Sequence, residues 1–298
     1  MHAKPTFRFA PSPTGLLHIG HALSAIIGYD WAKRLGGRFI VRIEDTDVGR
    51  ARPQFINAIL DDLAWLGLSW QEPVRRQSEH LDVYAAHQRR LQEAGLLYPC
   101  FATRSEIAEA ARTSPAAVDP DGALIYPGLH KNLDPVEIDQ RIKRGEAYAL
   151  RLDMARAITA ATVKLGGRPL TMTCFSIDGS TQDVTLDPNR WGDVVIARKD
   201  TGTSYHLAGV IDDADQGVTH VCRGQDLAAA SDIHRLLQVL LGLPQPLYHH
   251  HDLVLDEAGR KLSKSAGDTA LSQLRGSGWT SLRVRQRLEP FLAAYRVV

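Results

Sequence analysis

The chain has 298 residues, 44% of them hydrophobic and 23% charged, with a formal net charge of +1 at pH 7. This length gives room for one large domain or two modest ones around a substantial core. The balanced charge excludes a generally basic coat for nucleic acid, and no apolar run approaches the ~20 residues that a membrane span requires.

The first part of the chain alternates between strand-like and helix-like patterns. The expected strands are Phe7–Ala10, Arg38–Ile43 and a short one at Arg75–Ser78, and the expected helices are Ala22–Leu35, Pro53–Leu66 and Leu81–Ala94. The second of these helices has the clearest periodicity, with a proline near its start and a glycine after its end. This alternation predicts an α/β fold with a parallel, Rossmann-like sheet.

Near Tyr98 the alternation gives way to short helical pieces, turns and β-rich runs. It resumes at Ser204–Ile211 and continues into a helix expected at Ser231–Leu241. We therefore expect an α+β insertion that splits the Rossmann-like domain. The expected parts are the first half of that domain at residues 1–97, the insertion at 98–195, the second half at 196–245, and a lysine-containing loop with a short helical C-terminal segment at 246–298.

The stretch Arg8–His21 joins the first expected strand to the first expected helix through a turn rich in Pro, Ser and Gly. A strand, a glycine turn and a helix N-terminus can bind phosphate, because free backbone N–H groups and the helix dipole point at the anion. His18 and His21 project from the first helical turn on nearly the same side, and Gly20 allows close approach to the backbone. Taken alone, such a histidine pair on a helix is more often structural or incidental than catalytic.

A second phosphate-binding signal is Lys261–Ser265, Lys-Leu-Ser-Lys-Ser, which follows a Gly-Arg turn. Two lysines and two hydroxyls on a loop suit a polyphosphate, although a solvated basic loop has the same composition. From residue 260 to the end of the chain, eight Lys or Arg stand against two acids. This end includes an expected helical stretch at Leu282–Tyr295, and it offers either a face for RNA phosphates or an ordinary solvated helix face.

Together and in this order, the two stretches resemble the HIGH and KMSKS signatures of class I aminoacyl-tRNA synthetases. The flanking motifs are similar to those of the glutamate-specific branch: Arg8–Gly15, Arg42–Asp47, Tyr205–Ala208 and Thr219–Gly224. The resemblance covers most of residues 6–265, and four ordered motifs make it highly specific. It implies a class I synthetase fold in which the insertion cradles the acceptor end of a tRNA.

The resemblance also implies that the chain activates a carboxylic acid with ATP. It assigns His18, Gly20 and His21 to binding of the ATP phosphates. It assigns Lys264 to the phosphates and the leaving pyrophosphate, with Lys261 assisting, so that the two histidines and the two lysines are the catalytic residues. A leucine replaces the methionine of the family's lysine signature, which removes no charge. Mg²⁺ is expected as the counterion of the phosphates.

A glutamate substrate has two carboxylates and one ammonium, and arginine binds a carboxylate through a two-pronged fork. By resemblance, Arg8 and Arg223 bind these carboxylates, and Tyr205 helps to hold the one on the side chain. Glu44 matches the acid that meets the ammonium, and Ser12 lies in the same amino-acid-binding loop. The structural alternative is that the first arginine and the glutamate pair only with each other and that the tyrosine belongs to the core.

One feature of the resembled family is altered here. Related proteins bind zinc in the insertion through a Cys-x-Cys pair, a tyrosine and a further cysteine. Cys100 and Tyr126 match, but Ala102 replaces one cysteine and His130 stands at the last position. Structural zinc sites use four N or S ligands, so this degenerate set predicts no bound zinc. The run His249–His251 is a second possible cluster, but consecutive strand residues alternate faces, which favours a structural or surface role.

Only 33 residues follow Ser265, whereas a full glutamyl-tRNA synthetase continues into a helical anticodon-binding domain. We therefore expect no such domain and a closer match to the truncated paralogues, the glutamyl-queuosine tRNA(Asp) synthetases. The resemblance implies tRNA-independent activation of L-glutamate and its transfer to the cyclopentenediol of queuosine in the anticodon of tRNA(Asp). An anticodon loop has splayed single-stranded bases, which proteins can recognise directly.

Two other functions stay open at this point. One is a minimal enzyme that charges the 3′ end of a glutamate tRNA, and the other is a non-catalytic RNA-binding relative. Met1–Thr6 contains no apolar core of a secretory signal. The three cysteines, Cys100, Cys174 and Cys222, are scattered and indicate reduced thiols. We expect a cytoplasmic monomer that does not bind a membrane.

Overall fold

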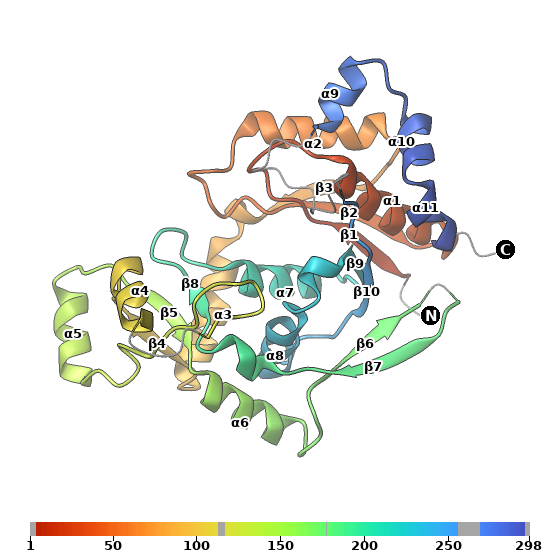
Figure 1. Ribbon diagram of the computed structural model, residues 1–298. Helices are drawn as coiled ribbons and strands as arrows, with labels where there is room; N and C mark the ends of the chain where they lie inside the picture. Colours follow the sequence, from red (N-terminus) through yellow and green to blue (C-terminus); the bar gives the residue numbers. More distant parts are fainter. Residues whose placement is uncertain (1–3, 113–116, 177, 256–268, 296–298) are drawn as a thin grey trace.

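A seven-stranded sheet forms the centre of the molecule in the computed structural model, which describes residues 4–112, 117–176, 178–255 and 269–295 (Figure 1). Its strands are β1 (Thr6–Phe9), β2 (Arg38–Ile43), β3 (Gln71–Arg76), β6 (Thr171–Phe175), β7 (Thr181–Thr185), β9 (His220–Gly224) and β10 (Leu247–His251). They lie in the order β3-β2-β1-β9-β10-β6-β7. Every neighbouring pair is parallel except β6–β7, which is antiparallel.

Helices cover both faces of this sheet, which confirms the predicted α/β class. The helices of the described residues are α1 (Ile19–Arg34), α2 (Pro53–Trp65), α3 (Leu81–Glu93), α4 (Arg104–Arg112), α5 (Pro135–Lys143), α6 (Met154–Lys164), α7 (Tyr205–Asp215), α8 (Ser231–Leu241), α9 (Leu271–Gly276), α10 (Ser281–Arg287) and α11 (Glu289–Leu292). One core joins the sheet to α1, α2 and the C-terminal helices. A second core joins α3, α6, α7 and α8. None of the described helices is long and apolar enough to cross a membrane.

Strand alternation decides which side chains face which helices. On β2, Phe39 and Val41 pack into the core with α1, so Arg42 points to the opposite face. On β1, Phe7 packs into the same core, and Arg8 therefore points to the same face as the arginine of β2. Helix α7 covers this second face and brings Asp213 to the two arginines. Two strands and one helix thus build a buried ion cluster beside the sheet.

The inserted stretch contains a second sheet of three antiparallel strands, β4 (Leu97–Cys100), β5 (Ala149–Leu152) and β8 (Val195–Ala197). Figure 1 shows this sheet beside α4 and α5, on the side of the molecule away from the C-terminal helices. The remainder of the stretch behaves differently, because β6 pairs with β10 and extends the main sheet, and α6 packs into a core with α8. Residues 98–195 are therefore divided between two sheets, which sequence periodicity alone did not indicate.

The C-terminal segment is helical, as predicted, but it is not one continuous helix. The expected stretch Leu282–Tyr295 consists of α10, α11 and a 3₁₀ turn at Ala293–Tyr295. Pro290 lies in the first turn of α11, where its missing N–H costs nothing, and it cannot continue a preceding helix. Of the basic residues in this segment, Arg285 is bound to Asp30 of α1 by two hydrogen bonds of 2.8 and 3.1 Å.

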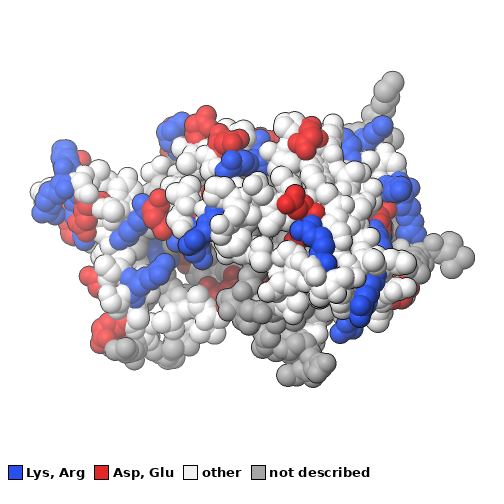
Figure 2. All heavy atoms as spheres, turned by 90° about the horizontal axis from the view of Figure 1, so that it is seen from above, with Lys and Arg blue, Asp and Glu red and all other residues white. Residues whose placement is uncertain are grey.

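Charge is intermixed on the surface beside these helices. Figure 2 shows basic and acidic side chains interspersed on one face, with several basic side chains toward the side on which α10 and α11 lie. Two basic residues of this region contact aromatic rings: the Arg283 guanidinium lies 4.4 Å from the Trp279 ring centroid, and that of Arg275 lies 6.0 Å from the Trp65 ring centroid. Such stacked arginines cover apolar surface as well as carrying charge.

Candidate active site

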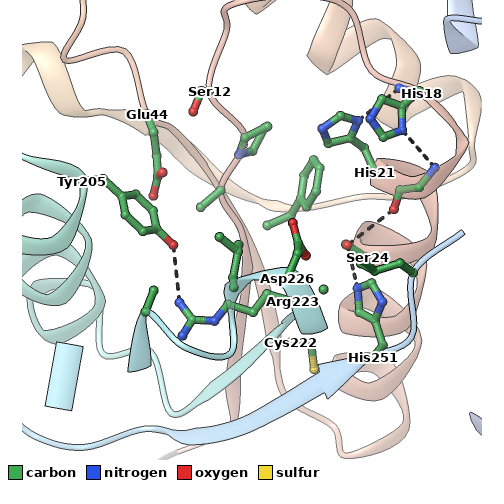
Figure 3. Close-up of a pocket in the computed structure, with 18 of the residues that line it drawn as sticks. Ser12, His18, His21, Ser24, Glu44, Tyr205, Cys222, Arg223, Asp226 and His251 are labelled. Carbon is green, nitrogen blue, oxygen red and sulfur yellow. Dashed lines mark hydrogen bonds between the residues drawn. The ribbon is translucent and has the colours of Figure 1, made fainter. Parts of the chain in front are cut away.

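A cavity of about 610 Å³ lies at the carboxyl ends of β1, β9 and β10, beside the N-terminus of α1. Open α/β sheets bind their ligands at this edge. Figure 3 shows the polar side chains that face one another across it. Eight residues singled out from the sequence line the cavity, namely Arg8, Ser12, His18, Gly20, His21, Glu44, Tyr205 and Arg223.

The two histidines form the wall of the cavity at the start of α1. His18 is the N-cap, and its Nδ1 accepts a hydrogen bond of 3.2 Å from the backbone N–H of Gly20. The Nδ1 of His21 accepts a hydrogen bond of 3.1 Å from the backbone N–H of His18. In each neutral ring the proton therefore sits on Nε2, from which it can be donated to an oxygen anion. The ring centroids are 3.8 Å apart, so both imidazoles can contact the same bound group.

Gly20 also lies close against the His18 ring. A Cβ atom at this position would lie 3.1 Å from Cε1 and 3.2 Å from Nδ1 of the His18 ring. The absent side chain therefore makes room for the imidazole that caps the helix. The close approach of a ligand to the backbone at this glycine stays a prediction, and Gly20 does line the cavity.

Arg8 reaches the cavity from β1 and is held by a carboxylate. Its Nε donates to Oδ1 of Asp213 at 3.3 Å, and Arg42 donates to the same oxygen at 2.7 Å. Burial would raise the pKa of Asp213, but the two guanidinium groups outweigh it and lower that pKa. Asp213 is therefore a shared anion between two buried cations, and it orients the arginine that lines the cavity.

Glu44 follows β2 and faces the cavity from the same cluster. Its Oε1 accepts a hydrogen bond of 3.2 Å from Arg42. Burial raises the pKa of Glu44, while Arg42 and Arg8 oppose that rise. The partner of Glu44 is thus Arg42 and that of Arg8 is Asp213, so the alternative of an exclusive Arg8–Glu44 pair is wrong.

Arg223 extends from β9 toward the cavity, where its hydrogen-bond partners are imidazole and hydroxyl groups. Its Nε donates to Nε2 of His250 at 3.2 Å, and its Nη1 donates to Nδ1 of His234 at 3.2 Å. Its Nη1 also donates to Oη of Tyr205 at 3.4 Å, and its Nη2 donates to Oγ of Ser231 at 2.6 Å. Only 4% of Arg223 is exposed. No carboxylate within the described ranges forms an ion pair with it, so this buried cation lies at the cavity with neutral partners.

Tyr205 and Ser12 line the cavity from two other segments. Tyr205 opens α7 after the capping residue Ser204, and 37% of its surface is exposed, so the alternative that it is a core residue is wrong. Ser12 lies in the exposed turn between β1 and α1, with its hydroxyl on the cavity side in Figure 3.

The cavity also contains polar residues that the sequence analysis did not assign to a site. Ser24 lies one turn after His21 on α1, and its Oγ is 2.7 Å from Nε2 of His251. Asp226 lines the same cavity from the turn after β9. The spacing from His21 to Ser24 is a helical i, i+3 interval, which could have predicted that both residues share one face. The position of His251 depends on strand pairing and has no local signal.

The histidine run on β10 alternates as predicted, but its role is only partly structural. His249 and His251 point toward α1, where His249 contacts the ring of Trp31. His250 points to the other face and accepts the hydrogen bond of Arg223, its register partner on β9. Two of the three histidines therefore belong to the candidate site or contact it directly.

The lysines predicted from the second signature, Lys261 and Lys264, lie outside the described residues. The three cysteines do lie within the described ranges, and all are free thiols. Two of them, Cys100 and Cys222, are buried. Burial raises the pKa of the Cys222 thiol, and Arg8 opposes that rise only weakly. A thiol whose ionised form is disfavoured in this way is a poor nucleophile.

The altered zinc motif forms a compact hydrogen-bonded cluster. The Cys100 thiol donates to Oη of Tyr126 at 3.4 Å, and that oxygen accepts the backbone N–H of His130 at 2.8 Å. Nδ1 of His130 accepts the backbone N–H groups of Phe101 and Ala102, each at 3.0 Å. The lone pair of that nitrogen is therefore engaged, and the alanine offers no donor atom. These residues do not fit the four N or S ligands of a structural zinc ion.

Comparison with known proteins agrees with this geometry. Residues 5–289 match the family model of class I tRNA synthetases (E and Q), catalytic domain. A Glutamyl-Q tRNA(Asp) synthetase from Rhodobacter capsulatus is 45% identical over 284 residues, which cover 94% of this chain and 98% of that protein. A glutamate–tRNA ligase from Prochlorococcus marinus is 37% identical over 93% of this chain but only 56% of its own length.

A solved structure shares the fold. The crystal structure of a glutamate tRNA ligase from Elizabethkingia meningosepticum, in complex with its amino acid, aligns with a TM-score of 0.68 at 29% identity. The alignment covers 93% of this chain and 53% of that one, so the chain spans about half of the ligases that it matches. The chain therefore belongs to the class I tRNA synthetases of the glutamate and glutamine branch, and within that branch to the glutamyl-queuosine tRNA(Asp) synthetase family.

Proposed function

We propose that this ligase activates L-glutamate with ATP, without tRNA, and transfers the glutamyl group to the cyclopentenediol of queuosine in the anticodon of tRNA(Asp). The observation that carries the amino-acid part is Arg223, a buried guanidinium at the cavity whose described partners are all neutral. A buried cation without an anion is costly, and a substrate carboxylate removes that cost.

The rest of the cavity matches the other groups of glutamate. Arg8 is close enough to the cavity to bind the second carboxylate, and Glu44 provides an anion for the ammonium. Tyr205 and Ser12 add hydroxyls at the same cavity. The solved ligase bound to its amino acid has the same fold, which supports an amino acid as the occupant.

Activation forms one bond and breaks another. A carboxylate oxygen of glutamate attacks the α-phosphorus of ATP, and the bond from that phosphorus to the bridging oxygen of pyrophosphate breaks. His18 and His21 can donate Nε2–H hydrogen bonds to the phosphate oxygens as their charge shifts. The N-terminus of α1 adds backbone N–H groups and its dipole. Bound Mg²⁺ would neutralise phosphate charge, and Lys261 and Lys264 are proposed to hold the leaving pyrophosphate.

Transfer then uses the glutamyl-adenylate. A hydroxyl of the cyclopentenediol attacks the acyl carbon, its proton is lost to solvent or a base, and AMP leaves with its electron pair. The relative from Rhodobacter capsulatus supports this acceptor, because its similarity extends over nearly the whole of both chains. We further propose that the small sheet with α4 and α5 contacts the tRNA, and that the reaction takes place in the cytoplasm, where tRNA is found.

The test is transfer of labelled glutamate, with ATP and Mg²⁺, to two tRNA pools. One pool comes from cells that make queuosine and the other from cells that lack it. Label on the queuosine pool alone, retained after removal of the tRNA 3′ end, is the expected result. Label on both pools that is lost with the 3′ end would establish a glutamate–tRNA ligase instead, the activity named for the 37% identical relative. Absence of glutamate-dependent ATP–pyrophosphate exchange would leave only an RNA-binding protein.

A further inference from the structure

Arg223 is bound at all three guanidinium nitrogens by groups that carry no charge. Nε is bonded to His250, Nη2 is bonded to Ser231, and Nη1 is bonded to His234 and Tyr205. The distances to the two imidazoles and the serine hydroxyl are 3.2, 3.2 and 2.6 Å. Among the residues that the structure describes, every side chain that accepts a hydrogen bond from Arg223 is therefore neutral.

The imidazoles must be neutral in this geometry. Arginine has only donors, so Nε2 of His250 and Nδ1 of His234 accept and cannot bear protons. Burial and the charge of Arg223 lower the pKa of His250 to about 3, and they lower that of His234 well below its usual range. His206, whose ring lies 5.3 Å from that of His234, has its pKa lowered to about 4 for the same reasons. Two neutral histidines are thus bonded to this guanidinium, and a third lies against one of them.

The other buried arginines near the cavity, unlike Arg223, form ion pairs with carboxylates. Arg8 is bound to Asp213, and Arg42 is bound to both Asp213 and Glu44. The fold therefore has carboxylates available on α7 and after β2, and it places none of those described within ion-pair distance of Arg223. The aromatic ring of Tyr248, whose centroid is 5.5 Å from the guanidinium carbon, is a further uncharged neighbour.

We propose that Ser231, His234 and His250 are specificity-determining residues. They hold Arg223 in place with neutral acceptors and leave its positive charge to be balanced by the substrate. The site therefore selects a substrate with a side-chain carboxylate over one with a carboxamide. This inference rests on the proposed function and adds the basis of discrimination between glutamate and glutamine. A carboxylate neutralises the buried cation and accepts from it. A carboxamide supplies no negative charge. Its NH₂ group is a hydrogen-bond donor and cannot bond to the guanidinium of Arg223, which also has only donors.

The decisive test compares two variants of Ser231 that have nearly the same shape but differ in charge. Ser231→Asp places a carboxylate beside Nη2 of Arg223, whereas Ser231→Asn adds nearly the same volume without charge. The readout is the ratio of kcat/KM for glutamate to kcat/KM for glutamine in ATP–pyrophosphate exchange. We expect Ser231→Asp to lower this ratio about 100-fold, because the protein anion replaces the substrate anion. Ser231→Asn is expected to lower both kcat/KM values while keeping most of the ratio.

Ser231 is fully buried, so the aspartate variant has a second, less enclosed counterpart at His250. His250→Glu is compared with His250→Gln, with thermal unfolding of all four variants as the measure of folding. An equal loss of the ratio in the charged and neutral members of both pairs would overturn the proposal, as would an unchanged ratio in both charged variants. If the wild type shows no exchange, the proposed function fails. The ratio of the dissociation constants for glutamine and glutamate, measured by calorimetry in the same variants, then tests the inference about selectivity by itself.

Discussion

Arg8 and Arg223 reach the same cavity from neighbouring parallel strands, β1 and β9, but the protein surrounds them in opposite ways. Arg8 shares the carboxylate of Asp213 with a second arginine, and burial of these charges depends on their mutual attraction. Arg223 is fixed by imidazole and hydroxyl groups. Both arginines belong to the expected substrate-binding set. The charge of Arg8 is balanced by a carboxylate of the protein, whereas that of Arg223 is left for the ligand to balance.

The difference separates structural from substrate-directed charge. The cluster of Arg8, Arg42 and Asp213 ties two strands to α7, so loss of one member leaves buried charge uncompensated whether or not substrate is present. The neutral setting of Arg223 ties β9 to α8 and β10 without an ion pair. Changes in the first setting should therefore reduce stability, and changes in the second should reduce substrate binding.

The largest effect is expected for Arg223→Ala. Without this guanidinium, the KM for glutamate in ATP–pyrophosphate exchange should rise about 1000-fold, since a desolvated charge pair with the substrate is lost. The KM for ATP should stay near the wild-type value, and the melting temperature should change little because no protein carboxylate loses its partner. An equal rise in both KM values would indicate a folding defect instead and would contradict the assignment.

Asp213→Asn should give the largest loss of stability. Arg8 would lose the carboxylate to which it is bonded, and Arg42 would lose its shortest carboxylate contact, at a cost of about 3 kcal/mol in the free energy of unfolding. Chemical denaturation measures this change. Asp215→Asn on the same helix is the matched control, because its carboxylate is 40% exposed and its ion pair with Arg75 should contribute less than about 1 kcal/mol. Similar losses for the two variants would show that the buried cluster is not held by its charges.

Gly20→Ala should separate the phosphate side of the cavity from the amino-acid side. The new Cβ would lie 3.1 Å from the His18 ring, which must shift by a few tenths of an ångström to relieve the contact, so the rate of adenylate formation should fall about tenfold. The glutamate KM should remain close to that of the wild type, because both arginines lie elsewhere in the cavity. Gly28→Ala is the control on the same helix, where the nearest side-chain atom is at 3.4 Å. A changed glutamate KM in the first variant would show that the two sides are coupled.

Local patterns predicted the elements well but predicted their contacts less well. The bounds of β2 and α8 agree with the structure, because α8 has apolar residues at helical spacing and β2 is a short aromatic and β-branched run that ends at an acidic segment. Eight predicted site residues meet at one cavity, where β1, β2 and β9 end and where α1 and α7 begin. Asp213 was missed, since it is one acid in a helix and its role depends on which sheet face that helix covers.

The neutral partners of Arg223 were missed for a related reason. His234 and His250 lie on α8 and β10, and only the register of β9 with β10 brings the second of these histidines to the arginine. The alternation of the histidine run was predicted correctly, yet alternation does not state what each face meets. Likewise, the pairing of β6 with β10 joins part of the insertion to the main sheet through a contact far along the chain. Such contacts are tertiary, and no short window of sequence contains them.

The smallest expected effect is the pH dependence of stability that arises from His250, the neutral partner of Arg223. Burial and Arg223 lower the pKa of His250 to about 3 in the folded chain, whereas an unfolded histidine has a pKa of about 6.5. Between these values the unfolded state binds more protons, so stability falls as the pH falls below about 6.5. At pH 6 this one histidine should cost about 0.8 kcal/mol relative to pH 8, and His250→Gln should remove that part of the loss. Denaturation of wild type and variant at both pH values measures it, and parallel changes in the two proteins would mean that folding does not lower the pKa of His250.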